Sequence, residues 1–223
     1  MAFFIIPIIA GCKADPAKPA GFIRNNTIMA KDDNLPFHRV WYDKNVDWPG
    51  YDKVIVAPVN TDYLAKATWW DAISLAWDRE KDTRQIADYM KTRLQQAFEK
   101  KEDNRFSVTT SPGPGTLMLE MALVELAPTK ACLNAAGLLI GLTIDHGMVA
   151  FEARLKDSSS GRVIATFADR EQGKTSLVSV TDYTWFGHAE KVIDDWAEQT
   201  VVVLNANFSR YIDDSETLTL EPW

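Results

Sequence analysis

Hydrophobic residues recur at three- and four-residue steps in two stretches of the chain. In residues 82–101 and again in residues 187–205, apolar side chains fall on one side of a helix and charged side chains on the other. A period near 3.6 residues with a single apolar side is typical of an amphipathic helix that packs on a core. The pattern therefore predicts two long helices over these ranges.

Short apolar or alternating stretches predict strands between and before these helices. An alternating strand, a turn of sequence DSSSG at 157–161 and a return strand together predict a β-hairpin over residues 148–169. The other expected strands are Lys53–Val59, Phe106–Thr109 and Thr116–Leu126.

The order of these elements predicts an α+β fold. We expect a two-layer sandwich, with a mostly antiparallel sheet and the two amphipathic helices packed on one face. Residues 22–205 would form this single domain, followed by an acidic C-terminal tail over 206–223. Three stretches within the domain have weaker patterns: we interpret 22–50 as an irregular strap, 64–78 as a short helix or structured loop, and 127–147 as a flexible connection.

The first twelve residues read as an export signal. The apolar run from Phe3 to Ala10 is too short to cross a bilayer of about 30 Å. It ends in Ile9-Ala10-Gly11-Cys12, which resembles the lipobox of bacterial lipoproteins. The alternative is a buried first strand, which Pro7 disfavours.

The lipobox resemblance implies a signal peptide over residues 1–11 and a lipid on Cys12. Residues 12–21 would then be the lipidated cysteine and a flexible tether, since KADPAKPAG is rich in proline, alanine and lysine. The residue after the cysteine is Lys13 rather than aspartate, which implies sorting to the outer membrane, on its periplasmic side.

Composition excludes several function classes. The chain has 46% hydrophobic and 25% charged residues, as globular proteins do, and a net charge of −7. The negative charge argues against nucleic acid as a partner, because phosphate binding requires a basic surface. Two cysteines are too few for a disulfide framework.

Several segments together resemble one bacterial lipoprotein family, domain of unknown function 3313. They are IAGC at the N-terminus, VIVAPV, SPGPGTLMLEMALVEL, MVAFEARLKDSSSGRVIATFADRE and HAEKVIDDWAEQTVVVL, and the match extends over roughly residues 10–205. The resemblance implies a lipid-anchored envelope protein of a Gram-negative bacterium. It implies no activity and no catalytic residues.

Catalytic and metal motifs are missing from the sequence. His38, His146 and His188 are dispersed, and no ligand spacing such as C-x-x-C or H-E-x-x-H occurs. Cys132 and His146 could form a nucleophilic dyad, but no family signature surrounds either residue. We therefore predict a non-enzymatic protein with no cofactor, no catalytic residues and no metal site, and place a cysteine-dependent hydrolase last among the functions considered.

The aromatic residues are the candidate interface. They are Trp41, Trp48, Tyr51, Tyr63, Trp69, Trp70 and Trp77. Either they close the core between strap and helices, or they form a surface for a protein or glycan partner.

The sequence thus predicts an outer-membrane-anchored periplasmic lipoprotein that acts as a structural or accessory subunit of an envelope protein assembly. Its partners would be the membrane, through the lipid, and other envelope proteins. The alternative is a stand-alone periplasmic protein that binds a small molecule or glycan in a concave pocket lined by tryptophan.

Overall fold

Six strands and two long helices make up the part of the chain that the structure, a computed structural model, describes. The described residues are 15–65, 78–100, 104–127, 148–172, 187–209 and 211–212. The strands are β1 (Arg39–Tyr42), β2 (Lys53–Val56), β3 (Ser107–Val108), β4 (Thr116–Ala127), β5 (Met148–Asp157) and β6 (Val163–Gln172). The helices are α2 (Arg79–Lys100) and α4 (Gly187–Asn205), and short 3-10 turns lie at Asn26–Ile28 and Trp48–Gly50.

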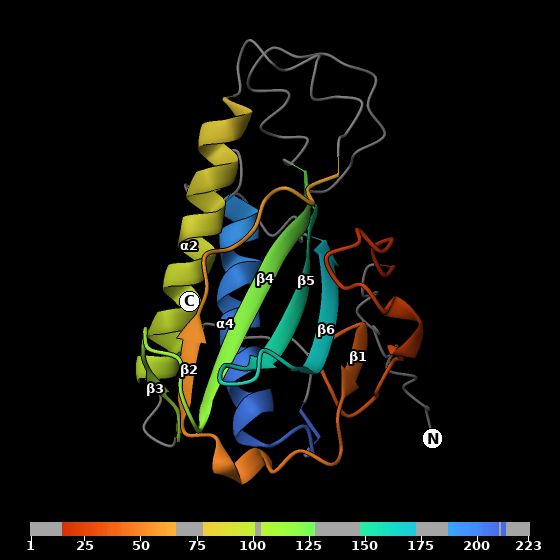
Figure 1. The fold of residues 1–223 in the computed structure, drawn as a ribbon. Helices are drawn as coiled ribbons and strands as arrows, with labels where there is room; N and C mark the ends of the chain where they lie inside the picture. The colour runs from red at the N-terminus through yellow and green to blue at the C-terminus, as the bar shows by residue number, and fades with distance from the viewer. Residues whose placement is uncertain are drawn as a thin grey trace, which may run out of the picture.

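The strands form one mixed sheet in the order β1-β6-β5-β4-β2-β3. The pairs β1–β6, β6–β5 and β5–β4 are antiparallel, whereas β2 runs parallel to both β4 and β3. Both helices cover the same face of the sheet (Figure 1). The predicted α+β fold, with a mostly antiparallel sheet and two helices on one face, is confirmed.

The main core lies between the sheet and the helices. Alternate residues of the long strands point into it, such as Leu119 of β4, Phe151 of β5 and Phe167 of β6, all fully buried. Met90 of α2 and Trp196 of α4 meet them from the helix side. The period of two in the strands and of 3.6 in the helices therefore place their apolar residues in the same layer.

Two strands of the sheet, β1 and β2, differ from the sequence-based prediction. Residues 39–42, predicted to be part of an irregular strap, form strand β1, in which Val40 is opposite Phe167 of β6. The predicted strand Lys53–Val59 ends at Val56, two residues before Pro58, which has no N–H to donate to a neighbouring strand.

A second apolar cluster lies on the face of the sheet opposite the helices. We call residues 15–30 the N-terminal segment; its Phe22, Ile23 and Met29 pack here. Beneath them the strands present small or β-branched residues, namely Ala122 and Val124 of β4, Ala150 of β5 and Ala168 of β6. These short side chains leave room for a chain to cross the strands. The sheet is therefore covered on one face by helices and on the other by the N-terminal segment.

Candidate functional site

A buried carboxylate holds the N-terminal segment on the sheet. Glu152 of β5 is only 1% exposed. Its two oxygens accept hydrogen bonds from the backbone N–H groups of Ala20 and Ile23, both at 2.8 Å. Because a buried carboxylate is stable only when its oxygens are hydrogen-bonded, Glu152 and the segment depend on each other.

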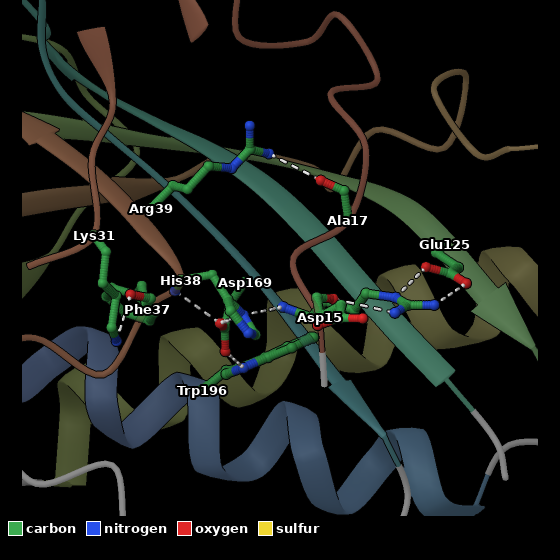
Figure 2. Close-up of polar contacts among 10 residues, drawn as sticks. Asp15, Ala17, Lys31, Phe37, His38, Arg39, Glu125, Asp169 and Trp196 are labelled. Atoms are coloured by element: carbon green, nitrogen blue, oxygen red, sulfur yellow. Dashed lines mark hydrogen bonds and ion pairs between the residues drawn. The ribbon is translucent and has the colours of Figure 1, made fainter. Parts of the chain in front are cut away.

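Arginines from three strands bind the carbonyl groups of the same segment. Arg39 of β1 donates to Ala17 O at 3.2 Å, and Arg170 of β6 donates to Asp15 O at 3.1 Å. These contacts, with Asp15, Ala17 and Arg39 labelled, are drawn in Figure 2. The described part of the predicted flexible tether, residues 15–21, is therefore bound to the folded domain.

Arg154 of β5 also contacts the segment. It donates to the carbonyl oxygen of Phe22 at 3.3 Å, and its guanidinium lies 4.0 Å from the centre of the Phe22 ring. The guanidinium also lies 2.8 Å from Glu120 of β4. A planar cation can make both contacts at once, so Arg154 joins the segment to the charged side chains of the sheet.

Ion pairs complete this face of the sheet. Besides binding Arg154, Glu120 binds Lys156 at 2.8 Å, and Arg170 makes a two-pronged contact with Glu125 at 2.7 and 3.0 Å. The contact with Glu125 raises the pKa of Arg170. Glu120 of β4 is paired with residues of the neighbouring β5, whereas the Arg170–Glu125 pair joins β6 to β4 across β5. Pairing of this kind favours a role in holding the segment in place.

A second polar cluster lies in the main core. The Asp169 side chain of β6 is almost fully buried and accepts hydrogen bonds from the backbone N–H of His38 at 3.0 Å and from Trp196 Nε1 at 2.8 Å. His38 Nδ1 lies 2.5 Å from Asp169 Oδ1 (Figure 2). Asp169 thus connects the start of β1, strand β6 and helix α4.

Chemically, a His–Asp pair supplies two of the three members of a catalytic triad, in which the aspartate orients the imidazole. In this protein His38 is only 8% exposed, and one aspartate oxygen is bound to an indole. The contacts therefore favour a structural role for His38 and Asp169. Cys132 and His146, the predicted alternative dyad, lie outside the described residues.

The sequence analysis did not single out Glu152 or Asp169 as site residues. For Asp169, the sequence did contain a signal, namely a carboxylate on the apolar side of a strand. Asp169 occupies an inward-facing position of β6, two residues after the buried Phe167. A carboxylate on the apolar side of a strand needs a buried partner, and a tryptophan on the apolar side of a helix can supply one.

The described residues of the predicted aromatic interface lie in two separate parts of the protein. Trp48, 6% exposed, packs in the core against Tyr51 and Phe208, with ring centres 6.4 and 5.0 Å away. Trp41 is half-buried beside the N-terminal segment, and Tyr63 is 37% exposed. Trp69, Trp70 and Trp77 lie outside the described residues.

Tyr63 and the N-terminal segment are in contact. The ring of Tyr63 meets the ring of Phe22 edge to face, with centres 5.3 Å apart. Trp48 and Tyr51 therefore close one part of the core, whereas Trp41 and Tyr63 lie with the segment on the other face.

Tyr51 gives a prediction on pH dependence. Burial, and after it the hydrogen bond of its hydroxyl to Asp157 Oδ2 at 2.9 Å, raise the pKa of Tyr51 to about 12. Because the folded state favours the neutral phenol, this stabilisation is complete below pH of about 10 and is lost as the pH rises through 12. We expect the difference between the absorbance titrations of wild type and Tyr51→Phe at 295 nm to show one phenol that ionises near pH 12. A difference curve centred near pH 10 would contradict the buried hydrogen bond.

Two cavities among the described residues are open to the surface and lined by both polar and apolar side chains. One of about 420 Å³ lies between the Pro58–Leu64 stretch and the start of α2, and one of about 290 Å³ lies between α2 and α4 beside Arg93 and Asp194. The described residues that line these two cavities include no tryptophan. They differ from the tryptophan-lined pocket that the small-molecule alternative requires.

In the part of the chain that the structure describes, none of the helices combines the length and the apolar character needed to cross a membrane.

Comparison with known proteins gives one sequence match. A family model described as Protein of unknown function (DUF3313) matches residues 18–200. No curated protein sequence matches the chain.

Among solved structures, the chain is similar in fold to a PelC dodecamer from Paraburkholderia phytofirmans (11% identity, 72% of this chain and 96% of that chain, TM-score 0.39). It is also similar to a protein from Xanthomonas campestris (14% identity, 74% and 91% covered, TM-score 0.43) and to a minor lipoprotein from Acinetobacter baumannii (14% identity, 71% and 95% covered, TM-score 0.35). At such low identities, these similarities concern the fold alone.

Proposed function

Since the chain belongs to the DUF3313 family of proteins of unknown function, we propose, from its own residues, that it is a lipoprotein anchored in the outer membrane through Cys12. The domain would lie on the periplasmic side and act as a structural or accessory subunit of an envelope protein assembly.

The observation that carries this proposal is the docked N-terminal segment directly after the lipobox-like Ile9-Ala10-Gly11-Cys12. Three residues after Cys12, the carbonyl of Asp15 is bound by Arg170, and the contacts of Glu152 with Ala20 and Ile23 follow. A lipid on Cys12 would therefore be coupled directly to the sheet.

The buried polar groups support a non-enzymatic role. Asp169 and Glu152 both use their oxygens to hold elements of the fold together. Groups that serve a reaction have to reach a substrate, whereas both carboxylates are almost fully buried.

Metabolic labelling with radioactive palmitate tests the anchor. We expect the wild type and Cys132→Ala to incorporate label and to sediment with membranes, and Cys12→Ala to do neither, because lipidation requires the thiol. Cys132→Ala is the matched control, since the chain has two cysteines. Equal labelling of Cys12→Ala and the wild type would contradict the anchor.

The assembly role is tested by the native size of the detergent-extracted protein. A subunit should elute far above 25.1 kDa plus the micelle and should co-purify with other envelope proteins in fixed ratio. A monomer without companions would contradict the subunit role and would favour the stand-alone binding protein.

A further inference from the structure

The anchor can reach only a short distance from the sheet. A fully extended chain spans at most about 3.6 Å per residue, so the three steps from Cys12 to Asp15 cover at most about 11 Å. The Asp15 carbonyl is itself fixed 3.1 Å from the guanidinium of Arg170. A lipid on Cys12 therefore enters the membrane close to this part of the domain.

The docked segment removes the freedom that a tether would give. If residues 12–30 were a flexible coil, their ends would be separated by about 20–25 Å on average and the domain could turn freely. Glu152, Arg39 and Arg154 instead bind the segment at successive points. The described part of the segment therefore has a fixed position on the sheet.

The charge of the N-terminal segment differs from that of the whole chain. The segment, residues 15–30, contains two basic residues, Lys18 and Arg24, and one acidic residue, Asp15, which gives +1 in a chain of net charge −7. Both basic side chains are exposed. Basic residues next to a lipid anchor are attracted to anionic phospholipids, by about 1 kcal/mol for each residue near the surface.

Exposed apolar residues accompany these charges. Ile28, in the segment, is 44% exposed, and Tyr63, against Phe22, is 37% exposed. An aromatic ring with a polar hydroxyl suits the boundary between headgroups and acyl chains.

We propose that the face of the domain bearing the N-terminal segment lies against an anionic phospholipid surface, with α2 and α4 on the side facing away from the membrane. This inference rests on the proposed lipidation of Cys12. Partner proteins would then meet the helix side of the domain and the edges of the sheet.

Quenching by labelled lipids tests this orientation in the acylated full-length protein. Two exposed threonines make a matched pair: Thr27 in the segment and Thr92 on α2. Thr27→Cys and Thr92→Cys, each in a Cys132→Ser background, would carry the same fluorophore. The protein would be reconstituted into vesicles of phosphatidylethanolamine and phosphatidylglycerol that contain a nitroxide on the lipid headgroup.

We expect the fluorophore at residue 27 to be quenched several-fold more strongly than the one at residue 92. Equal quenching at the two positions, or stronger quenching at residue 92, would overturn the proposed orientation. Mass spectrometry of the N-terminal peptide separates the two proposals. Equal quenching with an acylated Cys12 refutes the orientation alone, whereas a Cys12 without acyl chains refutes the anchor and the orientation together.

Discussion

Replacing Asp169 with alanine is expected to lower the free energy of unfolding by about 3–5 kcal/mol, because two buried N–H donors lose their acceptor at a cost of about 1–3 kcal/mol each. The change removes the acceptor for the backbone N–H of His38 and for the indole N–H of Trp196, and both residues are buried. It also leaves a cavity where three elements meet. For a domain of this size, each 1 kcal/mol corresponds to a shift of about 2–4 °C in the melting temperature.

Urea unfolding followed by tryptophan fluorescence measures this effect. Asp52→Ala is the matched control, because the Asp52 side chain is 66% exposed, and we expect its free energy of unfolding to change by less than about 0.5 kcal/mol. Trp196→Phe keeps an aromatic ring against Phe151 but removes the indole N–H, so it should cost less than Asp169→Ala. If Asp169→Ala were as stable as Asp52→Ala, Asp169 would not connect the elements that meet there.

Replacing Glu152 with alanine is expected to release the N-terminal segment from the sheet. The carboxylate accepts hydrogen bonds from Ala20 and Ile23, and losing it costs about 2 kcal/mol of docking free energy, which raises the open fraction of the segment about thirtyfold. Once released, these N–H groups bind water, so the loss is confined to the segment and the main core stays folded.

Limited digestion with trypsin measures the release, because the segment contains Arg24, which is followed by Asn25 and is therefore a cleavable site. Cleavage after Arg24 should accelerate by about the same thirtyfold in Glu152→Ala, since proteolysis follows the population of the open form. Glu99→Ala, on the exposed side of α2, is the matched control and should be cleaved at the rate of the wild type. An unchanged rate in Glu152→Ala would show that the carboxylate does not hold the segment.

The parts of the fold that the sequence predicts well are those with a local pattern. Helix α2 and the β5–β6 hairpin each show their period within one stretch of chain, and the structure places them within a few residues of the expected bounds. Strand β1 has only four residues, which is too short to show a clear alternation of apolar and polar positions. It is a strand because it pairs with the distant β6, where Val40 lies opposite Phe167, and local sequence does not show this pairing. The prediction of a flexible tether likewise rested on local composition. Composition does not show that side chains of distant strands bind the backbone of this segment.

The candidate site also contains one feature that depends on distant residues and one that depends on a local motif. Glu152 alternates with apolar residues in β5, on the side that also carries Arg154 and Lys156, which predicts exposure to solvent. It is buried because the N-terminal segment covers it. Lipidation of Cys12, in contrast, depends on a short continuous motif, so it could be proposed from sequence and stays a prediction.

The docking of the N-terminal segment also determines an order of events during synthesis. Glu152 follows Ala20 by 132 residues and Ile23 by 129, so the ribosome completes the segment long before its binding site exists. In a nascent chain exported from its N-terminus, the N-terminal segment therefore cannot bind Glu152 while most of the domain is still being made. If Cys12 is acylated as we propose, the modifying enzymes would meet an open substrate, and the later arrival of β5 would close the segment onto the sheet afterwards.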